Sequence, residues 1–328
     1  MKHLDVVIGI STYNDYTLLS YLLQSIRWHS TTFSGTYEIL VCDDGTPDHQ
    51  VEGWDISYKE KLQQVCDRFG ASLVLHETNM GIPATWNHLA NESSFAHSKH
   101  IIILNNDLLV APYWLDSMVY FADNNKEFGG ANLPYYHIEA RNVEHVLETI
   151  SQNSTVVVVD PITRQPIGDD RSQPIGEKPG KIMCMSGCNF IMRRDVFEKV
   201  GPFDERIVSF HEESSYGTRA AAEFKYPSWC LPWPNIYHVW GYTFSENQDT
   251  LKPSKRMAES RKIYCETWDV PDEFASNPFE YTDPKYMPLI PKRQVKWLLG
   301  SSNRCIVDRD TGQTIVLEPE IKEVQEEI

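Results

Sequence analysis

Short apolar runs alternate with longer segments of helical periodicity through the first 130 residues. The runs lie at residues 6–10, 38–42, 72–76 and 101–104, and each is short enough for a buried strand. Between the first two runs, apolar residues recur at helical spacing at Leu18, Leu19, Leu22, Leu23 and Ile26. Such alternation predicts βαβ units, and therefore an α/β fold with a mainly parallel sheet flanked by helices.

Further helices are predicted over residues 59–69, 83–90 and 112–124, with Pro83 in the first turn of the second. Each of the four predicted strands ends in a polar or Gly-containing turn. In an open parallel sheet these turns gather at one edge, where ligands bind. The pattern therefore predicts a binding site formed by the turns after the strands.

Beyond residue 130 the pattern becomes less regular. We expect a hairpin over 155–167, strands at 189–192 and 235–240, and a helix over 212–224. Residues 168–181 are rich in Gly, Pro and charge, which predicts a loop that becomes ordered only with ligand.

From about residue 247 the chain turns to aromatic segments punctuated by proline. A helix over 253–267, an irregular segment over 271–291 and a terminal β-hairpin formed by 304–307 and 314–317 are expected. We predict one domain over residues 1–245, with halves of about 1–110 and 111–245, and a C-terminal extension over 246–328.

Composition narrows the possible functions. The 328 residues carry a formal charge of −16, which disfavours nonspecific nucleic-acid binding because that depends on Lys and Arg. No apolar run approaches the ~20 residues of a membrane span, and no signal peptide is evident. Seven cysteines without framework spacing suit reduced thiols, and Cys184 and Cys188 lack a second pair at zinc spacing. We therefore expect a cytoplasmic protein.

The strand at 101–104 ends in Asn105, Asn106 and Asp107. A carboxylate with amides beside it, at the carboxyl end of a buried strand, suits Mg²⁺ or Mn²⁺ held together with substrate phosphates. Taken alone, the same residues are more typical of an ordinary Asn/Asp turn. The other turns decide between the two interpretations.

Eight motifs in order resemble family 2 glycosyltransferases of the Rossmann-like GT-A fold, over roughly residues 4–245. They lie at 10–14, 41–45, 79–81, 104–107, 186–194, 200–206, 211–213 and 237–241. Each is weak singly, and their order and spacing carry the resemblance. The family's metal-binding Asp-x-Asp is here Asn105-Asn106-Asp107, so its first carboxylate is an amide.

The resemblance implies roles for particular residues. Asp107 would meet the cation, Mn²⁺ or Mg²⁺, and His238 would be its second protein ligand. The acceptor side would include Gly187, Asn189 and Arg219. The residues implied for the donor nucleotide are Thr12, Tyr13, Asn14, Asp44, Asn79, Gly81 and Asn106.

The resemblance also implies a general base at the start of the helix after residue 211. The register favours Glu213, and Glu212 remains the alternative; both acids would also suit a helix N-terminus with no catalytic role. The Glu replaces the family's Asp, and the later acidic position is Ser215. Aromatic residues such as Trp86, Tyr135 and Tyr136 are given no site role.

The implied function is that of an inverting, metal-dependent glycosyltransferase using a nucleoside-diphosphate sugar, with UDP or dTDP favoured. The acceptor would be a saccharide or another hydroxyl compound, and a modified nucleobase stays open. One alternative is a nucleotide-sugar-binding module with a decayed site, which the missing first Asp favours. A sugar-nucleotide pyrophosphorylase is less consistent, because residues 11–14 lack the Gly-rich, basic loop that class needs.

Overall fold

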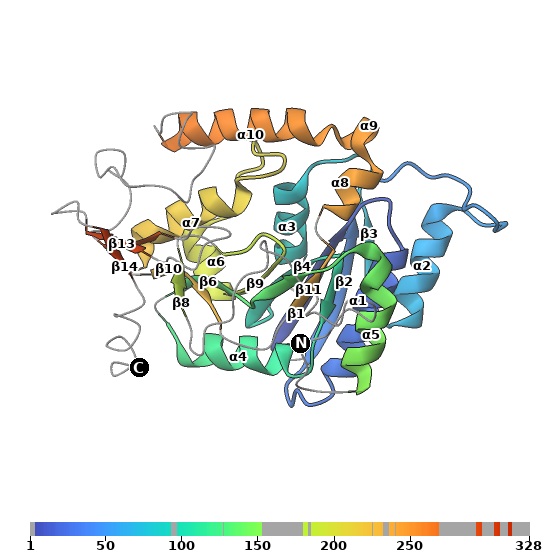
Figure 1. Ribbon diagram of the computed structural model, residues 1–328, viewed down its shortest axis with the longest axis horizontal. Coiled ribbons are helices and arrows are strands. Elements are labelled where there is room, and N and C mark those ends of the chain that lie inside the picture. Colours follow the sequence, from blue (N-terminus) through green and yellow to red (C-terminus); the bar gives the residue numbers. More distant parts are fainter. Residues whose placement is uncertain are drawn as a thin grey trace.

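A computed structural model defines the fold as three layers, with a central sheet between two layers of helices (Figure 1). It describes residues 4–92, 97–126, 128–152, 180–182, 185–224, 226–231, 236–239 and 241–268, and three short strands between 293 and 316. The predicted α/β class with a mainly parallel sheet is confirmed.

The central sheet has eight strands in the order β3-β2-β1-β4-β9-β6-β10-β8. The strands β3, β2, β1 and β4 run parallel, whereas β9 is antiparallel to both of its neighbours. Four strands lie at or near the sequence predictions: β1 (Val6–Thr12), β2 (Tyr37–Asp43), β3 (Ser72–Leu75) and β4 (His100–Asn105). The others are β6 (Phe128–Asn132), β8 (Gly180–Ile182), β9 (Asn189–Arg193) and β10 (Tyr226–Cys230).

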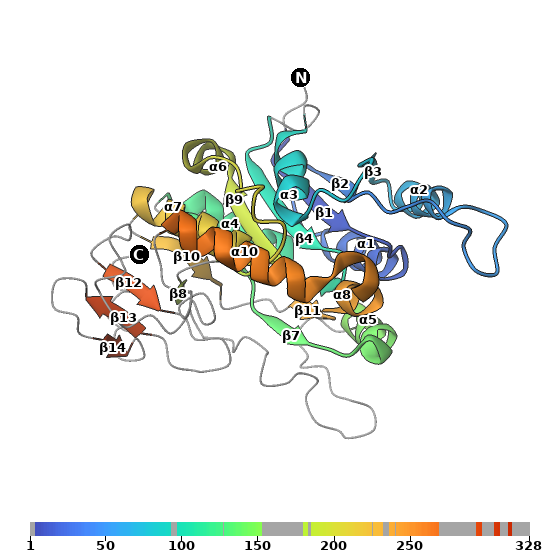
Figure 2. The ribbon, with the colours of Figure 1, turned by 90° about the horizontal axis from the view of Figure 1, so that it is seen from above.

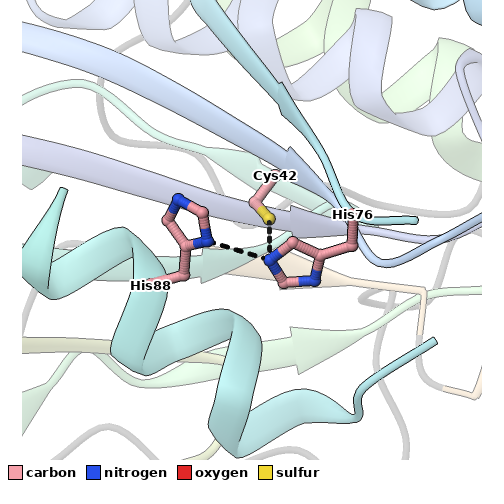
Figure 3. Close-up of side chains that lie close together, drawn as sticks. All are labelled: Cys42, His76 and His88. Atoms are coloured by element: carbon pink, nitrogen blue, oxygen red, sulfur yellow. Dashed lines mark hydrogen bonds between the residues drawn. The ribbon is translucent and has the colours of Figure 1, made fainter. Parts of the chain in front are cut away.

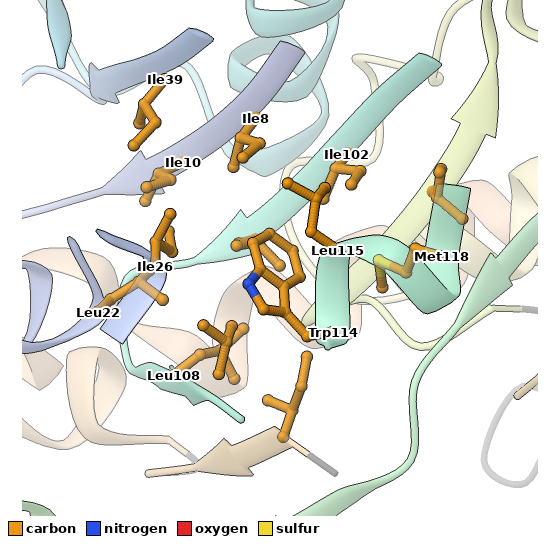
Figure 4. Packing of buried hydrophobic residues seen from close by; sticks show 14 of the residues in the cluster. Ile8, Ile10, Leu22, Ile26, Ile39, Ile102, Leu108, Trp114, Leu115 and Met118 are labelled. Atoms are coloured by element: carbon orange, nitrogen blue, oxygen red, sulfur yellow. The ribbon is translucent and has the colours of Figure 1, made fainter. Parts of the chain in front are cut away.

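Alternate residues of the parallel strands enter two separate cores, as a pleated strand requires. On one face, Ile8, Ile10 and Ile102 pack against helices that include Leu22, Trp114 and Met118 (Figure 4). On the other face, Val7, Ile101 and Ile103 pack against Trp86 and Leu89. Burial on both faces explains why these strands are continuous apolar runs.

The helices divide between the two faces of the sheet. The first core is covered by α1 (Thr17–His29), α2 (Tyr58–Arg68) and α4 (Trp114–Asn124). The second core is covered by α3 (Ile82–Asn91), α6 (Arg194–Val200) and α7 (Glu212–Glu223). Beside α1 lies α5 (Val143–Gln152), which follows the 3-10 turn η1 (Ala140–Asn142).

A small second sheet completes the edge where the parallel strands end. It has the order β5-β11-β7, formed by β5 (Leu108–Val110), β11 (Ile236–His238) and β7 (Tyr135–His137). Because β5 begins directly after Asp107 and β11 ends at His238, the pairing of Leu108 with His238 brings these two polar ends together. The sequence prediction did not include β5 or β7.

The C-terminal segment crosses the molecule above the sheet. It contains α8 (Tyr242–Glu246), α9 (Gln248–Leu251) and α10 (Pro253–Trp268), and α10 runs along the side of α7 and α3 (Figures 1 and 2). Further on, β12 (Arg293–Lys296) pairs with β13 (Cys305–Asp308), which pairs antiparallel with β14 (Thr314–Val316). The predicted terminal hairpin is therefore confirmed.

Several predicted segments fall outside the described residues. These are the hairpin at 155–167, most of the loop at 168–181, the irregular segment at 271–291 and the acidic end of the chain. Gly180 and Lys181, predicted within the loop, belong instead to β8, which pairs with β10. None of the helices in the described part of the chain is long and apolar enough to cross a membrane.

Candidate active site

Asp43 ends β2 and Asp44 follows it, and both carboxylates hold the turns around them through hydrogen bonds. Asp43 accepts hydrogen bonds from Thr46, through backbone nitrogen at 2.8 Å and hydroxyl at 2.7 Å, and from the Tyr58 hydroxyl at 3.0 Å. Asp44 accepts hydrogen bonds from the backbone nitrogens of Met80 and Gly81, both at 2.9 Å. Asp44, predicted to contact the nucleotide, therefore holds the 79–81 turn.

Gly81 occupies a position where a side chain would not fit. Its φ is +94°, and a Cβ there would lie 2.6 Å from the carbonyl oxygen of Val208. Backbone of this kind favours glycine, which lacks the clashing atom. The close neighbour of Gly81 is therefore Val208, which accepts a hydrogen bond from Ile82 at 3.0 Å. The predicted nucleotide contact of Gly81 stays a prediction.

Both polar atoms of the Asn79 side chain form hydrogen bonds. Its side-chain nitrogen donates to the carbonyl of Asp44 at 3.1 Å, and its side-chain oxygen accepts from Arg256 at 2.8 Å. Burial raises the pKa of the nearby Tyr13 hydroxyl, and the charge of Arg256 opposes this rise. The sequence analysis did not identify Arg256, which comes from α10 and brings a positive charge to the predicted donor loops.

Hydrogen bonds also hold the turn after β1. The Thr12 hydroxyl donates to the carbonyl of Asp15 at 3.0 Å. Asn14, with φ of +52°, donates from its backbone to the Thr46 hydroxyl at 2.8 Å and from its side chain to Asn247 at 2.7 Å. These bonds join the predicted donor loops to one another and to the segment before α9.

Asp107 and His238 face each other at the start of the second sheet. Asp107 Oδ1 lies 3.3 Å from His238 Nε2, and both side chains are buried. Burial by itself would lower the pKa of His238, but the Asp107 charge, with help from Cys188, outweighs it and raises the pKa to about 10. Among the described residues, His238 Nδ1 has no hydrogen-bond partner.

This pair fits a divalent cation. A carboxylate and an imidazole already lie at a separation like that of neighbouring ligands on one ion, which is about 3 Å for metal–ligand bonds of about 2.1 Å. Their burial would be costly for isolated charges and is suited to a paired or ion-binding role. The predicted ligands Asp107 and His238 are thus brought together.

Asp15 adds a second carboxylate that the sequence analysis missed. Its Oδ2 accepts from the Asn106 side chain at 3.1 Å, while its Oδ1 accepts from the backbone of Thr17 and Leu18. Burial raises the pKa of Asp15 to about 6, and the Asp107 charge adds to this rise. A negative charge near Asp107 partly replaces the one lost at Asn105.

Aromatic rings enclose His238. Tyr135 and His137, both from β7, meet it edge-on with ring centroids 5.5 Å and 5.9 Å away. Burial raises the pKa of Tyr135, and the charge of Glu213 contributes to that rise. Tyr135 therefore lies between the Asp107–His238 pair and the start of α7. The sequence analysis gave Tyr135 no role.

Glu212 and Glu213 open α7, which begins after His211 in a left-handed conformation. Burial raises the pKa of both carboxyls, and for Glu212 the neighbouring Glu213 charge adds to the rise. Their Oε2 atoms are buried without a hydrogen-bond partner among the described residues. A raised pKa and an unsatisfied oxygen suit a carboxylate that accepts a proton.

The backbone at Gly187 contacts one of the two candidate bases, Glu213. A Cβ on Gly187 would lie 3.5 Å from Glu213 Cδ and 3.5 Å from the Trp86 ring, so the Gly187 backbone lies against Glu213. Cys188, its neighbour, lies close enough to His238 to help raise the pKa of that imidazole, and the Cys188 carbonyl accepts from the Asn105 backbone at 2.9 Å. The 186–188 turn therefore places Glu213 and the Asp107–His238 pair on one site.

Two residues predicted for the acceptor side lie elsewhere. The Asn189 side chain is fully buried and accepts from the Leu133 backbone at 2.9 Å. Arg219 donates to the carbonyl of Pro202 and lies near Gly201. Of the three residues predicted for the acceptor side, Gly187 lies against the Glu213 carboxylate, and the acceptor roles of Asn189 and Arg219 stay predictions.

Comparisons with known proteins identify the family of the chain. The sequence model described as glycosyl transferase family 2 matches residues 7–201, which include Asp44 and Asp107 but end before Glu213 and His238. Comparison with curated proteins gives no match.

Solved structures share the fold at low identity. GalNAc-T7 with UDP, GalNAc and Mn²⁺ has a TM-score of 0.59 and 14% identity, over 88% of this chain and 52% of that one. The mannosyltransferase PcManGT from Pyrobaculum calidifontis, with GDP-Man and Mn²⁺, has a TM-score of 0.52 and 12% identity, over 88% of this chain and 73% of that one. S. aureus TarS 1-349 with UDP has a TM-score of 0.51 and 13% identity, over 87% of this chain and 70% of that one. The chain thus spans about half the length of GalNAc-T7.

Proposed function

Because the chain belongs to glycosyl transferase family 2, we propose that it transfers a sugar from a nucleoside diphosphate to a hydroxyl acceptor with inversion at the sugar carbon. The observation that carries this proposal is the placement of Glu213 beside the 186–188 turn, whose Cys188 lies near His238 of the buried Asp107–His238 pair. A base and a cation site on one face are what a direct displacement requires.

In this proposal each group has one task. Glu213 takes the proton of the acceptor hydroxyl as that oxygen attacks the sugar carbon, and the bond to the diphosphate breaks on the opposite side. Asp107 and His238 hold Mn²⁺ or Mg²⁺, with Asp15 adding negative charge nearby. The cation, when bound, neutralises charge on the leaving diphosphate. The raised pKa of Glu213 favours proton uptake.

For the donor we propose UDP or dTDP linked to a sugar. The resemblance implies that Asp44 meets the pyrimidine, and this carboxylate also holds the backbone of Met80 and Gly81 in the neighbouring turn. The known structures bind different bases, since GalNAc-T7 and TarS contain UDP and PcManGT contains GDP-Man. The base is therefore the part of the proposal to test first.

The test is a panel of nucleotide sugars incubated with the protein and Mn²⁺, with release of free nucleotide as the readout. We expect release from a UDP- or dTDP-sugar, and loss of release in excess EDTA with recovery on adding Mn²⁺. Faster release from a GDP-sugar would refute the donor assignment. Turnover that persists unchanged in EDTA would refute the cation, and binding of all donors without turnover would support the binding-module alternative.

A further inference from the structure

A second cluster of metal-ligand side chains lies outside the proposed active site, on the α3 side of the sheet. Cys42 Sγ lies 3.4 Å from His76 Nε2, and His76 Nε2 lies 3.0 Å from His88 Nδ1 (Figure 3). The three ligand atoms lie within 4.8 Å of one another. They come from three elements: β2, the residue after β3, and α3.

The outer nitrogen of each histidine faces a carboxylate. His76 Nδ1 lies 3.0 Å from Asp44 Oδ1, and His88 Nε2 lies 3.3 Å from Glu92 Oε2. An ionised carboxylate only accepts hydrogen bonds, so these outer nitrogens carry the protons. When both rings carry one proton each, on these outer nitrogens, their inner nitrogens present lone pairs to each other.

Two lone pairs 3.0 Å apart repel unless a cation lies between them. The single proton of the Cys42 thiol can satisfy only one of the two nitrogens. A metal ion would accept both lone pairs and the thiolate. Carboxylates on the outer nitrogens of ligating histidines are the usual supporting contacts of such metal sites.

The two shorter spacings in this cluster are close to those around a small tetrahedral ion, and the third pair, Cys42 Sγ and His88 Nδ1, lies within 4.8 Å. Zn–N bonds of about 2.05 Å and a Zn–S bond of about 2.3 Å place two nitrogens about 3.3 Å apart and nitrogen and sulfur about 3.6 Å apart. The observed 3.0 Å and 3.4 Å differ from these values by a few tenths of an ångström. Sulfur with two imidazoles selects Zn²⁺ over Mg²⁺ or Mn²⁺, which prefer oxygen.

We propose that Cys42, His76 and His88 form a Zn²⁺ site distinct from the proposed catalytic cation site. Cys42 and His76 are buried, whereas the His88 side chain is 34% exposed, so the ion would enter and carry water on that side. The site ties β2 and α3 to His76, whose Asp44 partner holds the backbone of Met80 and Gly81. Zinc would therefore stiffen the 79–81 turn.

The sequence analysis did not find this site because its ligands are 34 and 12 residues apart along the chain. Only the packing of α3 on β2 brings them together. The proposal does not depend on the transferase reaction, which would use Asp107 and His238.

Cobalt is the probe for the experiment, because a Co²⁺–thiolate bond gives a charge-transfer absorption band. Full-length protein freed of metal with a chelator is titrated with Co²⁺ and then with Zn²⁺. We expect a band that saturates at one equivalent and is removed by Zn²⁺. The band should be absent in Cys42→Ser. It should be present in Cys188→Ser, which tests the cysteine near the other candidate cation site, and in Cys66→Ser, which is a control at a buried cysteine.

The half-exposed ligand provides a variant that is expected to fold. His88→Gln should bind Zn²⁺ at least about tenfold more weakly, with an unchanged circular dichroism spectrum, and Zn²⁺ should raise the melting temperature of the wild type more than that of the variant. No band at one equivalent of Co²⁺ would overturn the proposal and leave a shared proton between the rings. A band lost in Cys188→Ser but kept in Cys42→Ser would overturn it as well.

Discussion

At the scale of single residues, the site depends on adjacent glutamates with different surroundings. Glu213 lies against Gly187, whereas Glu212 is the more buried of the two and lies at the first position of α7. We therefore expect Glu213→Gln to reduce acceptor-dependent turnover by roughly 10²–10⁴-fold, the usual contribution of a positioned base. The dissociation constant of the nucleotide should change little, because the predicted donor loops lie elsewhere.

Glu212→Gln is the matched comparison for that experiment. If Glu212→Gln abolishes turnover while Glu213→Gln keeps near-normal turnover, the register is wrong by one residue. If both variants remain active, the chain does not use a carboxylate base from α7. Initial rates measured at saturating donor and varied acceptor separate these outcomes.

The burial of Glu212 also predicts how stability depends on pH. Its folded-state pKa is raised, first by burial and then by Glu213, above the ordinary value of about 4.3 for an unfolded chain. The folded state therefore binds this proton more tightly, and stability is lost as pH rises from about 4 toward the raised pKa. At pH 8, Glu212→Gln should unfold with a free energy about 1–3 kcal/mol higher than the wild type.

Urea unfolding between pH 4.5 and pH 8 checks this expectation. The gap between Glu212→Gln and the wild type should narrow toward the acidic end, because there the wild-type carboxyl is protonated. Glu52, which is exposed, supplies the control Glu52→Gln, which should follow the wild type at every pH. A constant gap across the range would contradict the role assigned to burial.

At the scale of elements, the 79–81 turn is held by contributions from distant parts of the chain. Asp44 binds its backbone, Val208 lies against Gly81, and Arg256 from α10 bonds Asn79. Arg256→Met should weaken UDP binding about tenfold, because it removes both this bond and a positive charge near Tyr13.

Calorimetry of UDP binding in the presence of Mn²⁺ measures that effect. Lys255→Met is the matched control, since Lys255 is exposed and forms an ion pair with Glu259 on the same helix. It removes one charge from α10 and should leave the affinity within about twofold. Equal weakening by both substitutions would show that only the net charge of α10 matters.

The sequence predicted the elements whose apolar pattern is self-contained. The strand at 101–104 is buried on both faces, so its run of β-branched residues is sufficient to identify it. In contrast, β6 contains Gly129 and Gly130 and takes its stability from pairing with β9 and β10. The helix α5 could have been predicted, because its apolar residues have helical spacing at Val143, Val146, Leu147 and Ile150.

The residues of the site also fall into two groups: those that sequence motifs identify and those that only tertiary packing brings near. Asp107, His238, Glu213 and Gly187 were predicted through motifs, and the structure gathers them around the 186–188 turn. Asp15, Tyr135 and Arg256 were missed because their nearness to the site arises from tertiary packing, which no local pattern records. Arg256 shows this most clearly, since it meets Asn79 from 177 residues away in the sequence.

At the scale of the whole molecule, the predicted boundary at residue 245 lies in a region of extensive contact. Asn247 bonds Asn14 at 2.7 Å, Ser260 accepts from the Ser209 backbone at 3.2 Å, and the Trp268 indole donates to Ser215 at 3.1 Å. Tyr264 stacks on His211 and packs with Ile207. The segment from 246 to 268 therefore touches both the donor turns and the start of α7.

This contact pattern leads to a prediction about truncation. A chain ending after Trp268 keeps all of these bonds, whereas a chain ending after residue 245 loses Leu251 and Tyr264, which are buried, and leaves Ile207 uncovered. At about 1.5–3 kcal/mol for each fully buried side chain, the shorter chain should lose several kcal/mol of stability. It should also lose UDP binding, because Arg256 and Asn247 are absent.

The two truncated chains are compared by thermal unfolding and by UDP binding with Mn²⁺ present. We expect the chain ending at Trp268 to bind UDP within about threefold of the full-length protein, which would place the functional boundary after α10 rather than at 245. Retention of folding and UDP affinity by the chain ending at 245 would instead support the boundary predicted from sequence, and would show that the contacts of α10 with Asn79 and Ser209 are dispensable. Since α10 contacts both the donor turns, through Arg256, and the helix that carries Glu213, through Trp268, loss of UDP binding in the shorter chain alone would show that these contacts support the donor site.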